Sequence, residues 1–305
     1  MASISCPSCA STELLDRGAI PTVSQFAGHD IRTQVVDGRL YACASCHLHF
    51  RHPHLPAAVL ERLYQDADDD IWSQGPAQRT DYDIARSWIC GRQTPGDILD
   101  LGCYTGDFLE SVRTDSPVYG IEVNRQASAR AEARGVEIVG ATFEDLERFP
   151  ARFAVITAFD VIEHVADPLH LLSRIKASLA PGGITIISTG NTSARSWRFM
   201  GAAYYYCTNN EHISFVNPQW IVGAARNLGM TQEATRCFAH LKASLPYRLA
   251  QTLHNCAYRV SPALTHWLYR TCYRRSSIPE AGHALPPPNW ASARDHVIFC
   301  LGRGP

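Results

Sequence analysis

The chain has 305 residues, of which 46% are hydrophobic and 19% are charged, and its formal net charge is −1. This composition excludes a disordered polypeptide, and the near-neutral charge does not favour a nucleic acid as a partner, because no global field attracts a polyanion. The sequence holds no run of 18 apolar residues and starts without the pattern of a signal peptide, so we expect a cytoplasmic protein without a transmembrane helix.

Two pairs of cysteines near the N-terminus have the spacing of metal ligands. Cys6 and Cys9 form one C-x2-C pair, and Cys43 and Cys46 form the second. In a cytoplasmic protein this spacing is more typical of a metal site than of disulfides. Four thiolates complete a tetrahedral shell and leave no open position for a substrate, so we predict a structural Zn²⁺. The alternative is an irregular arm that carries four reduced cysteines.

The residues between the cysteine pairs predict a β-hairpin. Residues 31–36 and 39–42 are β-rich runs separated by Asp37-Gly38, a dipeptide typical of two-residue hairpin turns. Such a hairpin returns the second cysteine pair to the first, which is the arrangement of a zinc ribbon. Because so short a segment buries little apolar area, the metal would supply much of its stability. We assign residues 1–55 to this module.

Helices and strands alternate through the rest of the chain. Helices are expected at residues 56–65, 80–92, 107–113, 125–134, 168–179 and 218–228, and strands at residues 97–101, 118–121, 136–139, 153–158 and 184–188. This alternation predicts an α/β fold with a doubly wound, mostly parallel sheet. In such sheets a ligand binds beyond the carboxyl ends of the strands.

A glycine turn follows the first of these strands. Gly102 and Gly106 tolerate positive φ and let a ligand approach the backbone. Glu122 ends the next strand, 22 positions after Asp100, and this spacing suits a carboxylate that binds the hydroxyls of a ribose. The turn lacks the G-x-G-x-x-G spacing that seats a pyrophosphate. The pattern therefore favours an adenosine-containing ligand over a nicotinamide dinucleotide.

The segment ILDLGCYTGDFL, residues 98–109, resembles motif I of class I S-adenosylmethionine-dependent methyltransferases of the small-molecule and ubiquinone type. The resemblance continues in order through YGIEVN (119–124), GATFEDL (140–146), FAVITAFDVIEHVADP (153–168), LAPGGITIISTGN (179–191) and EHISFVNP (211–218). It implies a Rossmann-like sheet of seven strands within residues 56–305, ending in two antiparallel strands at residues 230–238 and 296–302. The cysteine-rich start also resembles members that act on sugars and secondary metabolites.

The resemblance implies S-adenosyl-L-methionine as the cofactor and a set of residues that hold it. Asp100 and Gly102 would line the methionine end, Glu122 the ribose, Thr142 and Phe143 the adenine, and Phe159 and Asp160 the underside of the cofactor. The full set is Asp100, Gly102, Cys103, Tyr104, Gly106, Glu122, Val123, Thr142, Phe143, Phe159 and Asp160.

Three members of this set carry open questions. Asp100 either contacts the cofactor or only holds the turn through the backbone amides. Tyr104 departs from the family's glycine, and it would crowd the methionine end or face the substrate. For Cys103, a role as a nucleophile competes with a role as a small apolar residue.

Methyl transfer to a hydroxyl needs a base that removes the acceptor's proton. The candidate catalytic residues are His212, His164 and Asp160. A short helix would place Asp160 and His164 on one face, because they are four positions apart. The alternatives are a structural His164 in the loop after the strand and a His212 that only shapes the acceptor pocket. Three tyrosines at positions 204–206 and Trp197 would line that pocket or pack a lid.

A helical insertion is expected at residues 240–293, between the last two strands. Residues 240–277 carry six Lys or Arg residues and no Asp or Glu. The segment also contains bulky apolar side chains, among them Tyr247, Tyr258, Trp267, Leu268, Tyr269 and Tyr273. Such a segment can contact a membrane surface, grip an anionic or lipid-linked acceptor, or cap the active site. The expected location is therefore cytoplasmic, with membrane association as an alternative.

The sequence thus predicts a methyltransferase that acts on a small molecule, a sugar or a glycan precursor, most simply at oxygen. One alternative is an RNA methyltransferase that uses the zinc ribbon to hold its substrate, and salt-dependent RNA binding would favour it. The other is a non-catalytic scaffold, which an absence of cofactor binding would favour.

Overall fold

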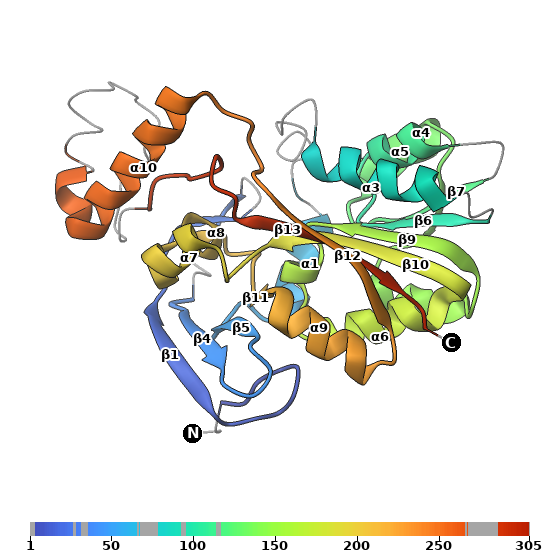
Figure 1. Cartoon of the computed structure of the whole chain (residues 1–305), viewed down its shortest axis with the longest axis horizontal. Coiled ribbons are helices and arrows are strands. Elements are labelled where there is room, and N and C mark those ends of the chain that lie inside the picture. Colours follow the sequence, from blue (N-terminus) through green and yellow to red (C-terminus); the bar gives the residue numbers. More distant parts are fainter. Residues whose placement is uncertain are drawn as a thin grey trace.

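The structure consists of a seven-stranded central sheet and a smaller N-terminal sheet (Figure 1). It is a computed structural model that describes residues 4–26, 29–31, 36–65, 67, 79–92, 96–113, 117–265, 267 and 286–304. Two very short strands, β2 (Gln25–Phe26) and β3 (His29–Asp30), pair with each other in a separate two-stranded sheet.

The central sheet has the strand order β12-β13-β10-β9-β6-β7-β8. Its strands are β6 (Ile98–Leu101), β7 (Val118–Ile121), β8 (Glu137–Gly140), β9 (Phe153–Phe159), β10 (Leu179–Gly190), β12 (Thr231–Phe238) and β13 (His296–Gly302). Only β13 runs antiparallel to its neighbours β10 and β12, and the described pairs among the other strands are parallel. All seven residues of β9 are buried, as a central parallel strand requires. The predicted fold class is confirmed.

Helices cover both faces of this sheet (Figure 1). On one face lie α3 (Thr80–Arg92), α4 (Asp107–Val112) and α5 (Arg125–Ala133), and on the other lie α6 (Pro168–Ser178) and α9 (Pro218–Asn227). Side-chain caps begin three of them: Asn124 for α5, Asp167 for α6 and Asn217 for α9. Proline at the first position of α6 and α9 adds a φ that already suits a helix.

Short elements fill the connections. They are α1 (Ala57–Gln65), α7 (Arg195–Met200), α8 (Tyr205–Thr208) and the 3-10 helices η1 (Phe143–Arg148), η2 (Ile162–His164) and η3 (Gly201–Ala203). β10 starts at Leu179, five residues before the predicted strand, because Leu179 already pairs with Phe153 ahead of an irregularity in the register.

The N-terminal sheet has the order β1-β4-β5-β11 and corrects the predicted hairpin. Its strands are β1 (Leu14–Ala19), β4 (Arg39–Cys43), β5 (His49–His52) and β11 (Ser214–Phe215). β4 pairs with β1 on one side and β5 on the other, so residues 39–42 do not pair with the predicted strand at 31–36, of which residues 32–35 lie outside the described part. The second cysteine pair reverses the chain between β4 and β5, and Asp37-Gly38 does not form the predicted hairpin turn.

The N-terminal sheet is joined to the main part of the chain. β11 follows the long connection after β10, yet it pairs with β5. The buried guanidinium of Arg51 donates to the side-chain oxygen of Asn210 at 3.0 Å and to the carbonyl oxygen of Asn209 at 3.0 Å. Trp220 of α9 donates from its indole nitrogen to the Ser8 hydroxyl at 3.1 Å. The boundary at residue 55 stays a prediction, but these contacts cross it.

The connection between β12 and β13 contains α10 (Leu245–Val260), which lies apart from the central sheet in Figure 1. Residues 268–285 of the predicted insertion, with Arg270, Arg274 and Arg275, lie outside the described residues. Among the helices of the described part, none combines the length and the apolar character needed to cross a bilayer.

Candidate active site

The turn after β6 adopts three left-handed backbone conformations. Gly102, Tyr104 and Gly106 have φ values of 65°, 49° and 81°. A Cβ atom at Gly102 would lie 2.9 Å from Cγ2 of Val161, so packing as well as the backbone angle requires glycine there. The Gly102 amide donates to the carbonyl oxygen of Ile121 at 2.8 Å, which ties the turn to β7. The result is a turn of left-handed backbone, the cradle, at the carboxyl edge of the sheet.

Glu122 links the cradle to the next strand. One carboxylate oxygen accepts from the Tyr104 amide at 2.8 Å, and the other accepts from the Asn124 amide at 2.8 Å. Burial raises the pKa of Glu122, and the amide donors counter part of that rise. A carboxylate offers about four lone-pair positions, so the two amides leave capacity for the hydroxyls of a ribose. Glu122 therefore positions Tyr104 in addition to its predicted place beside the ribose.

Asp100 is buried and has a partner that the sequence did not suggest. The Thr157 hydroxyl donates to its carboxylate at 2.6 Å. The amides of Gly102 and Cys103 donate to Ile121 instead, so Asp100 does not hold the turn through these amides. Burial raises the pKa of Asp100 to about 7, the Thr157 bond notwithstanding. Because this pKa is close to neutral, a cation bound in the cradle would favour the ionised form of Asp100.

Cys103 turns its side chain into the core and away from the cradle. It is 3% exposed and packs in one cluster with Leu109 and Val136. A Cβ atom at Gly120 would lie 2.5 Å from its sulfur, so the two positions fit only because residue 120 is glycine. Any contact of residue 103 with a ligand must come from its backbone. Burial also raises the pKa of the Cys103 thiol, which excludes a reactive thiolate.

Aromatic rings form the floor beside the cradle. Phe159, at the end of β9, is 6% exposed, and its ring centroid lies 4.6 Å from that of Phe108 and 4.8 Å from that of Tyr82. These rings come from β9, α4 and α3. Side chains of α3 and α4, on one face of the sheet, thus fix the ring of Phe159, which was predicted to lie under the cofactor.

The predicted adenine-side loop is organised by Asp145. This residue forms a capping box with Thr142, and its carboxylate accepts from the amides of Ala141 at 2.8 Å and Thr142 at 3.0 Å. Thr142 is exposed and Phe143 is half-buried, with its ring 5.7 Å from that of His170. Both are therefore accessible at the edge of the sheet, next to the end of β8.

Asn124 holds the end of α1 over the carboxyl edge of the sheet. Its side-chain amide donates to the carbonyl oxygens of Ala67 at 2.9 Å and Tyr64 at 3.3 Å. Val123, which was predicted to bind the cofactor, is half-buried beside it. Sequence reasoning missed Asn124 as an anchor, because its partners are 57 and 60 positions away.

Asp160 lies in an ion-pair network. Its φ is 53°, and η2 begins only at Ile162, so the predicted helix through Asp160 and His164 is wrong. Arg79 pairs with Asp160 at 2.6 Å and with Asp81 at 2.6 Å. Burial raises the pKa of Asp160, but the charge of Arg79 overrides it and lowers the pKa to about 2. So weak a base suits electrostatic positioning better than proton removal.

His212 is a buried imidazole with a defined hydrogen bond. It is 7% exposed, and its Nδ1 lies 2.8 Å from the carbonyl oxygen of Tyr206. Because a carbonyl only accepts, Nδ1 carries the proton and Nε2 keeps the lone pair. Burial, reinforced by the nearby His164 ring, lowers the pKa of His212 well below its usual value. His212 is therefore neutral near pH 7 with a free acceptor nitrogen.

His164 is held by contacts to two other segments. Its Nδ1 lies 2.6 Å from the Tyr64 hydroxyl and 3.1 Å from the carbonyl oxygen of Glu211. Burial lowers the pKa of His164. These contacts connect α1 to the segment before β11, and they favour the structural interpretation of His164 over a base.

Glu163 is a buried carboxyl group that the sequence reasoning missed. The Tyr206 hydroxyl donates to one of its oxygens, and the Thr189 hydroxyl donates to the other at 2.9 Å. Burial raises the pKa of Glu163 to about 8. Ligand atoms of Glu163, His164 and His212 all lie within 4.8 Å of one another, so this cluster can also hold a divalent cation.

A second buried network lies beside the first. The hydroxyls of Tyr204 and Tyr205 donate to Asp295 at 2.5 Å and 2.9 Å, and Nδ1 of His296 lies 2.9 Å from the same carboxylate. Asp295 raises the pKa of His296 against the effect of burial. The His296 ring lies 5.4 Å from that of Tyr206. The three tyrosines thus pack and polarise the wall of the site, and no local motif announced Asp295 or His296.

The four N-terminal cysteines come together. Their sulfur atoms all lie within 4.8 Å of one another, with 3.5 Å between Cys6 and Cys46 and between Cys9 and Cys43. Tetrahedral Zn–S bonds of about 2.3 Å give S–S edges of about 3.8 Å. The cluster therefore fits one zinc ion with little movement. The hydrogen bond between Cys6 and Cys46 lowers the pKa of Cys6 to about 5, which favours its thiolate form.

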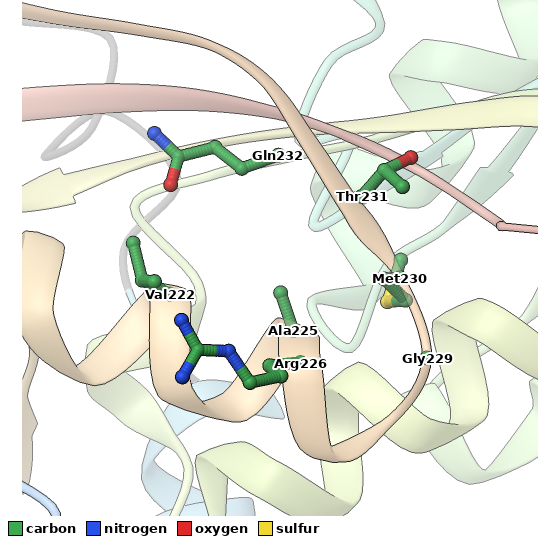
Figure 2. Close-up of a pocket in the computed structure, with 7 residues that line it drawn as sticks. All are labelled: Val222, Ala225, Arg226, Gly229, Met230, Thr231 and Gln232. Carbon is green, nitrogen blue, oxygen red and sulfur yellow. The ribbon is translucent and has the colours of Figure 1, made fainter.

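Two surface hollows lie outside these networks. Figure 2 shows the first, of about 460 Å³, between α9 and the start of β12, lined by Val222, Ala225, Arg226, Gly229, Met230, Thr231 and Gln232. Thr231 pairs with Gly302, which pairs with Ile184, so this hollow lies at the end of the sheet opposite the cradle. The second, of about 490 Å³, is lined by Thr80, Ala239, Leu241, Lys242, Ala243, Arg248, Ser292 and Arg294. Of its lining residues, Thr80 directly follows Arg79 in the sequence.

Fold and site define a class of protein: a doubly wound α/β domain with a glycine cradle and a carboxylate at the carboxyl edge of its sheet. The model of the family described as "Methyltransferase domain" matches residues 79–234, just over half of the chain. The chain belongs to this methyltransferase family.

Named relatives agree with this assignment. The chain is 31% identical over 147 residues to "Ubiquinone biosynthesis O-methyltransferase" of Paraburkholderia phymatum, a match that covers 44% of the chain and 63% of the relative. It is 27% identical over 147 residues to the protein of the same name from Ralstonia nicotianae, covering 44% and 62%. The matched part thus spans less than two thirds of these relatives. The structure of N-methyltransferase NodS from Bradyrhizobium japonicum with S-adenosyl-L-homocysteine shows 14% identity, covers 80% of the chain and 96% of NodS, and has a TM-score of 0.47.

Proposed function

We propose that the chain transfers a methyl group from S-adenosyl-L-methionine to a hydroxyl of a small molecule, with His212 as the general base. The observation that carries this proposal is the neutral, buried imidazole of His212, whose Nδ1 proton is held by the Tyr206 carbonyl at 2.8 Å. A base needs a free lone pair and a fixed tautomer, and this hydrogen bond provides both.

The cradle suits the cofactor. A Cβ atom at Gly106 would lie 2.9 Å from Cγ2 of the buried Val136, so the turn can pack against the core with its left-handed φ of 81° only because residue 106 is glycine. Glu122 keeps lone pairs for ribose hydroxyls. We assign the Asp100 carboxyl to the methionine end, where its pKa of about 7 leaves it partly ionised at neutral pH. When bound, S-adenosyl-L-methionine supplies an electrophilic methyl group on a sulfonium sulfur.

The chain's own part in catalysis is to position the acceptor and remove its proton. His212 Nε2 accepts the proton of the hydroxyl, and the Tyr206 carbonyl stabilises the imidazolium that forms. Asp160, held ionised by Arg79, supports a positive charge nearby. Tyr206 and His296 complete the wall that keeps water away.

Oxygen as the accepting atom is supported by the relatives named O-methyltransferases. Within this class a free small molecule, a sugar or glycan precursor, and a lipid-linked molecule all remain candidate acceptors. A screen of such acceptors that measures S-adenosylhomocysteine release identifies the class directly.

The base is tested by His212→Ala, with His254→Ala on α10 as a matched control. We expect kcat to fall about 10²- to 10⁴-fold while cofactor affinity, measured by calorimetry, stays nearly unchanged. A fall in cofactor affinity instead would remove His212 from the acceptor side.

The carboxylate and two imidazoles of Glu163, His164 and His212 favour a second way to activate a hydroxyl, namely a divalent cation. A chelator distinguishes the two. Activity that is lost with EDTA and restored by Mn²⁺ supports the cation, because two imidazoles and a carboxylate suit a transition metal, and the four thiolates do not select Mn²⁺. Activity that survives EDTA supports the base.

We also propose that Cys6, Cys9, Cys43 and Cys46 hold one structural Zn²⁺. The support is the approach of their sulfur atoms to within 4.8 Å. Elemental analysis should find one zinc per chain, and Cys43→Ser should lose it and lower the melting temperature. Zinc-free wild-type protein with an unchanged melting temperature would refute the site.

Two other functions make different predictions. An RNA methyltransferase should bind RNA with an affinity that falls steeply with salt, whereas we expect no such binding from a chain of net charge −1. A non-catalytic scaffold should show no cofactor binding by calorimetry.

A further inference from the structure

Exposed apolar side chains are concentrated on one segment of the molecule. Among the described residues, ten large hydrophobic side chains are exposed, and seven of them lie between residues 245 and 267. They are Leu245, Tyr247, Leu249, Leu253, Val260, Leu264 and Trp267, with exposed fractions from 49% to 86%. Singly scattered apolar residues are normal on a surface, but a contiguous group marks an interaction site.

Most of these side chains belong to the helix α10, which buries polar side chains and exposes apolar ones, the opposite of an ordinary surface helix. Its buried residues are Gln251, Asn255 and Tyr258, whereas Leu249 and Leu253 face outward. The Gln251 side-chain oxygen accepts from the Ser292 amide at 3.1 Å, so a polar contact fixes the helix to the connection before β13. A helix that buries polar groups and exposes leucines is oriented toward another apolar surface.

The exposed apolar residues form one stripe along the helix. Leu245, Leu249 and Leu253 follow at four-residue intervals, and Val260 comes seven residues after Leu253. Positions with this spacing lie on the same side of an α-helix. Figure 1 shows α10 apart from the central sheet.

The charges around the stripe have one sign. Lys242, Arg248 and Arg259 are exposed near it, and the sequence has no Asp or Glu from residue 240 to residue 277. A second copy of the chain would bring these cations against one another in a symmetric dimer. An anionic phospholipid surface neutralises them and accepts the leucines in its interfacial layer.

The helix also borders the second hollow. Lys242 and Arg248, beside the start of α10, line it together with Arg294 and Thr80. Arg79, which precedes Thr80 in the sequence, forms an ion pair with Asp160. A surface that contacts α10 would therefore lie close to this hollow.

We propose that the outward stripe of α10 docks the protein on an anionic phospholipid surface. This contact does not depend on methyl transfer, so it can be tested and can fail separately from the proposed function. The lipid surface is a partner, and the helix lies on it without crossing it.

The test is co-sedimentation of the full chain with sucrose-loaded vesicles, of phosphatidylcholine alone or mixed with phosphatidylglycerol. The triple variant Leu249→Ser, Leu253→Ser, Val260→Ser removes three outward side chains. The control variant Leu15→Ser, Val222→Ser removes exposed apolar side chains elsewhere.

We expect wild type and control to bind the anionic vesicles and to be partly released by salt. The triple variant should bind at least about tenfold more weakly, because each leucine or valine loses its favourable transfer into an apolar layer. Unchanged cofactor affinity and melting temperature in the triple variant establish that it is folded.

Three outcomes would overturn the proposal. The first is wild type that does not bind anionic vesicles. The second is equal binding of wild type and triple variant. The third is a concentration-dependent dimer, measured by light scattering, that the triple variant abolishes while vesicle binding is absent, because the stripe would then be an interface between copies of this chain.

Discussion

The glycine turn that would hold the cofactor, the cradle, and the buried side chains around His212, the acceptor wall, are built in opposite ways. The cradle comes from one stretch of chain, residues 98–124, and most of its hydrogen bonds join backbone atoms or a side chain to nearby amides. The acceptor wall is assembled from side chains that are far apart in sequence, such as Arg79 with Asp160 and Tyr205 with Asp295. A site made of local backbone geometry leaves a contiguous motif, and a site made of distant side chains does not.

Removal of the ribose carboxylate should have the largest effect on the cradle. We expect Glu122→Ala to weaken S-adenosyl-L-methionine binding about 100-fold, since it removes charge-assisted hydrogen bonds worth about 1.5–3 kcal/mol each and frees the Tyr104 amide. Calorimetry measures the change, with Glu132→Ala on the exposed side of α5 as the control. An unchanged dissociation constant would end the ribose assignment.

The pH dependence of cofactor binding tests a second residue next to the cradle, Asp100. The pKa of Asp100 is about 7, because burial disfavours its charged form. The ionised carboxylate attracts a cationic cofactor, so affinity should rise up to about tenfold from pH 6 to pH 8, as the carboxyl loses its proton. Asp100→Asn should flatten this dependence. A slope that persists in Asp100→Asn assigns the titration to another group.

The acceptor wall should respond in turnover and not in cofactor affinity. Tyr206→Phe removes the hydroxyl that donates to Glu163 but keeps the backbone carbonyl that holds His212. Loss of a donor to the carboxylate raises the pKa of Glu163 above about 8. We expect kcat to fall about tenfold, and any limb of the pH–rate profile near 8 to move upward. Tyr205→Phe, which loses a bond to Asp295 instead, should leave that limb in place.

The smallest expected effect concerns the one tyrosine in the glycine turn. Tyr104 has a φ of 49°, which costs about 1 kcal/mol in a residue with a side chain. Tyr104→Gly should therefore raise the free energy of unfolding by up to about 1 kcal/mol, as chemical denaturation would measure. A loss of stability would mean that contacts of the ring outweigh the backbone strain.

The sequence predicted the fold and the cradle well for a physical reason. Strands and helices of the main domain follow from alternating apolar runs, and the turn at Gly102 and Gly106 follows from residues that tolerate positive φ. The glycines and Glu122 lie where expected, whereas Cys103 faces the core because Gly120 leaves room for its sulfur. The roles of the cofactor residues remain predictions.

The acceptor side was predicted only in part. His212 was named, but Glu163, Arg79 and the pair of Asp295 and His296 were not, because their partners are brought together only by the sheet order. The hairpin at Asp37-Gly38 failed for a similar reason. A local turn signal does not reveal that both edges of β4 are taken by β1 and β5.

The two-residue strand β11 limits how far this protein can be divided. It is hydrogen-bonded to β5, and it follows His212 after a single residue. The frame that orients the imidazole is therefore anchored in the part of the chain that carries the cysteines. A version trimmed to residues 56–305 would keep the turn after β6 but lose β5, the strand with which β11 pairs next to His212. For transplanting this active site onto another domain, the unit to move is the N-terminal sheet and β11 together.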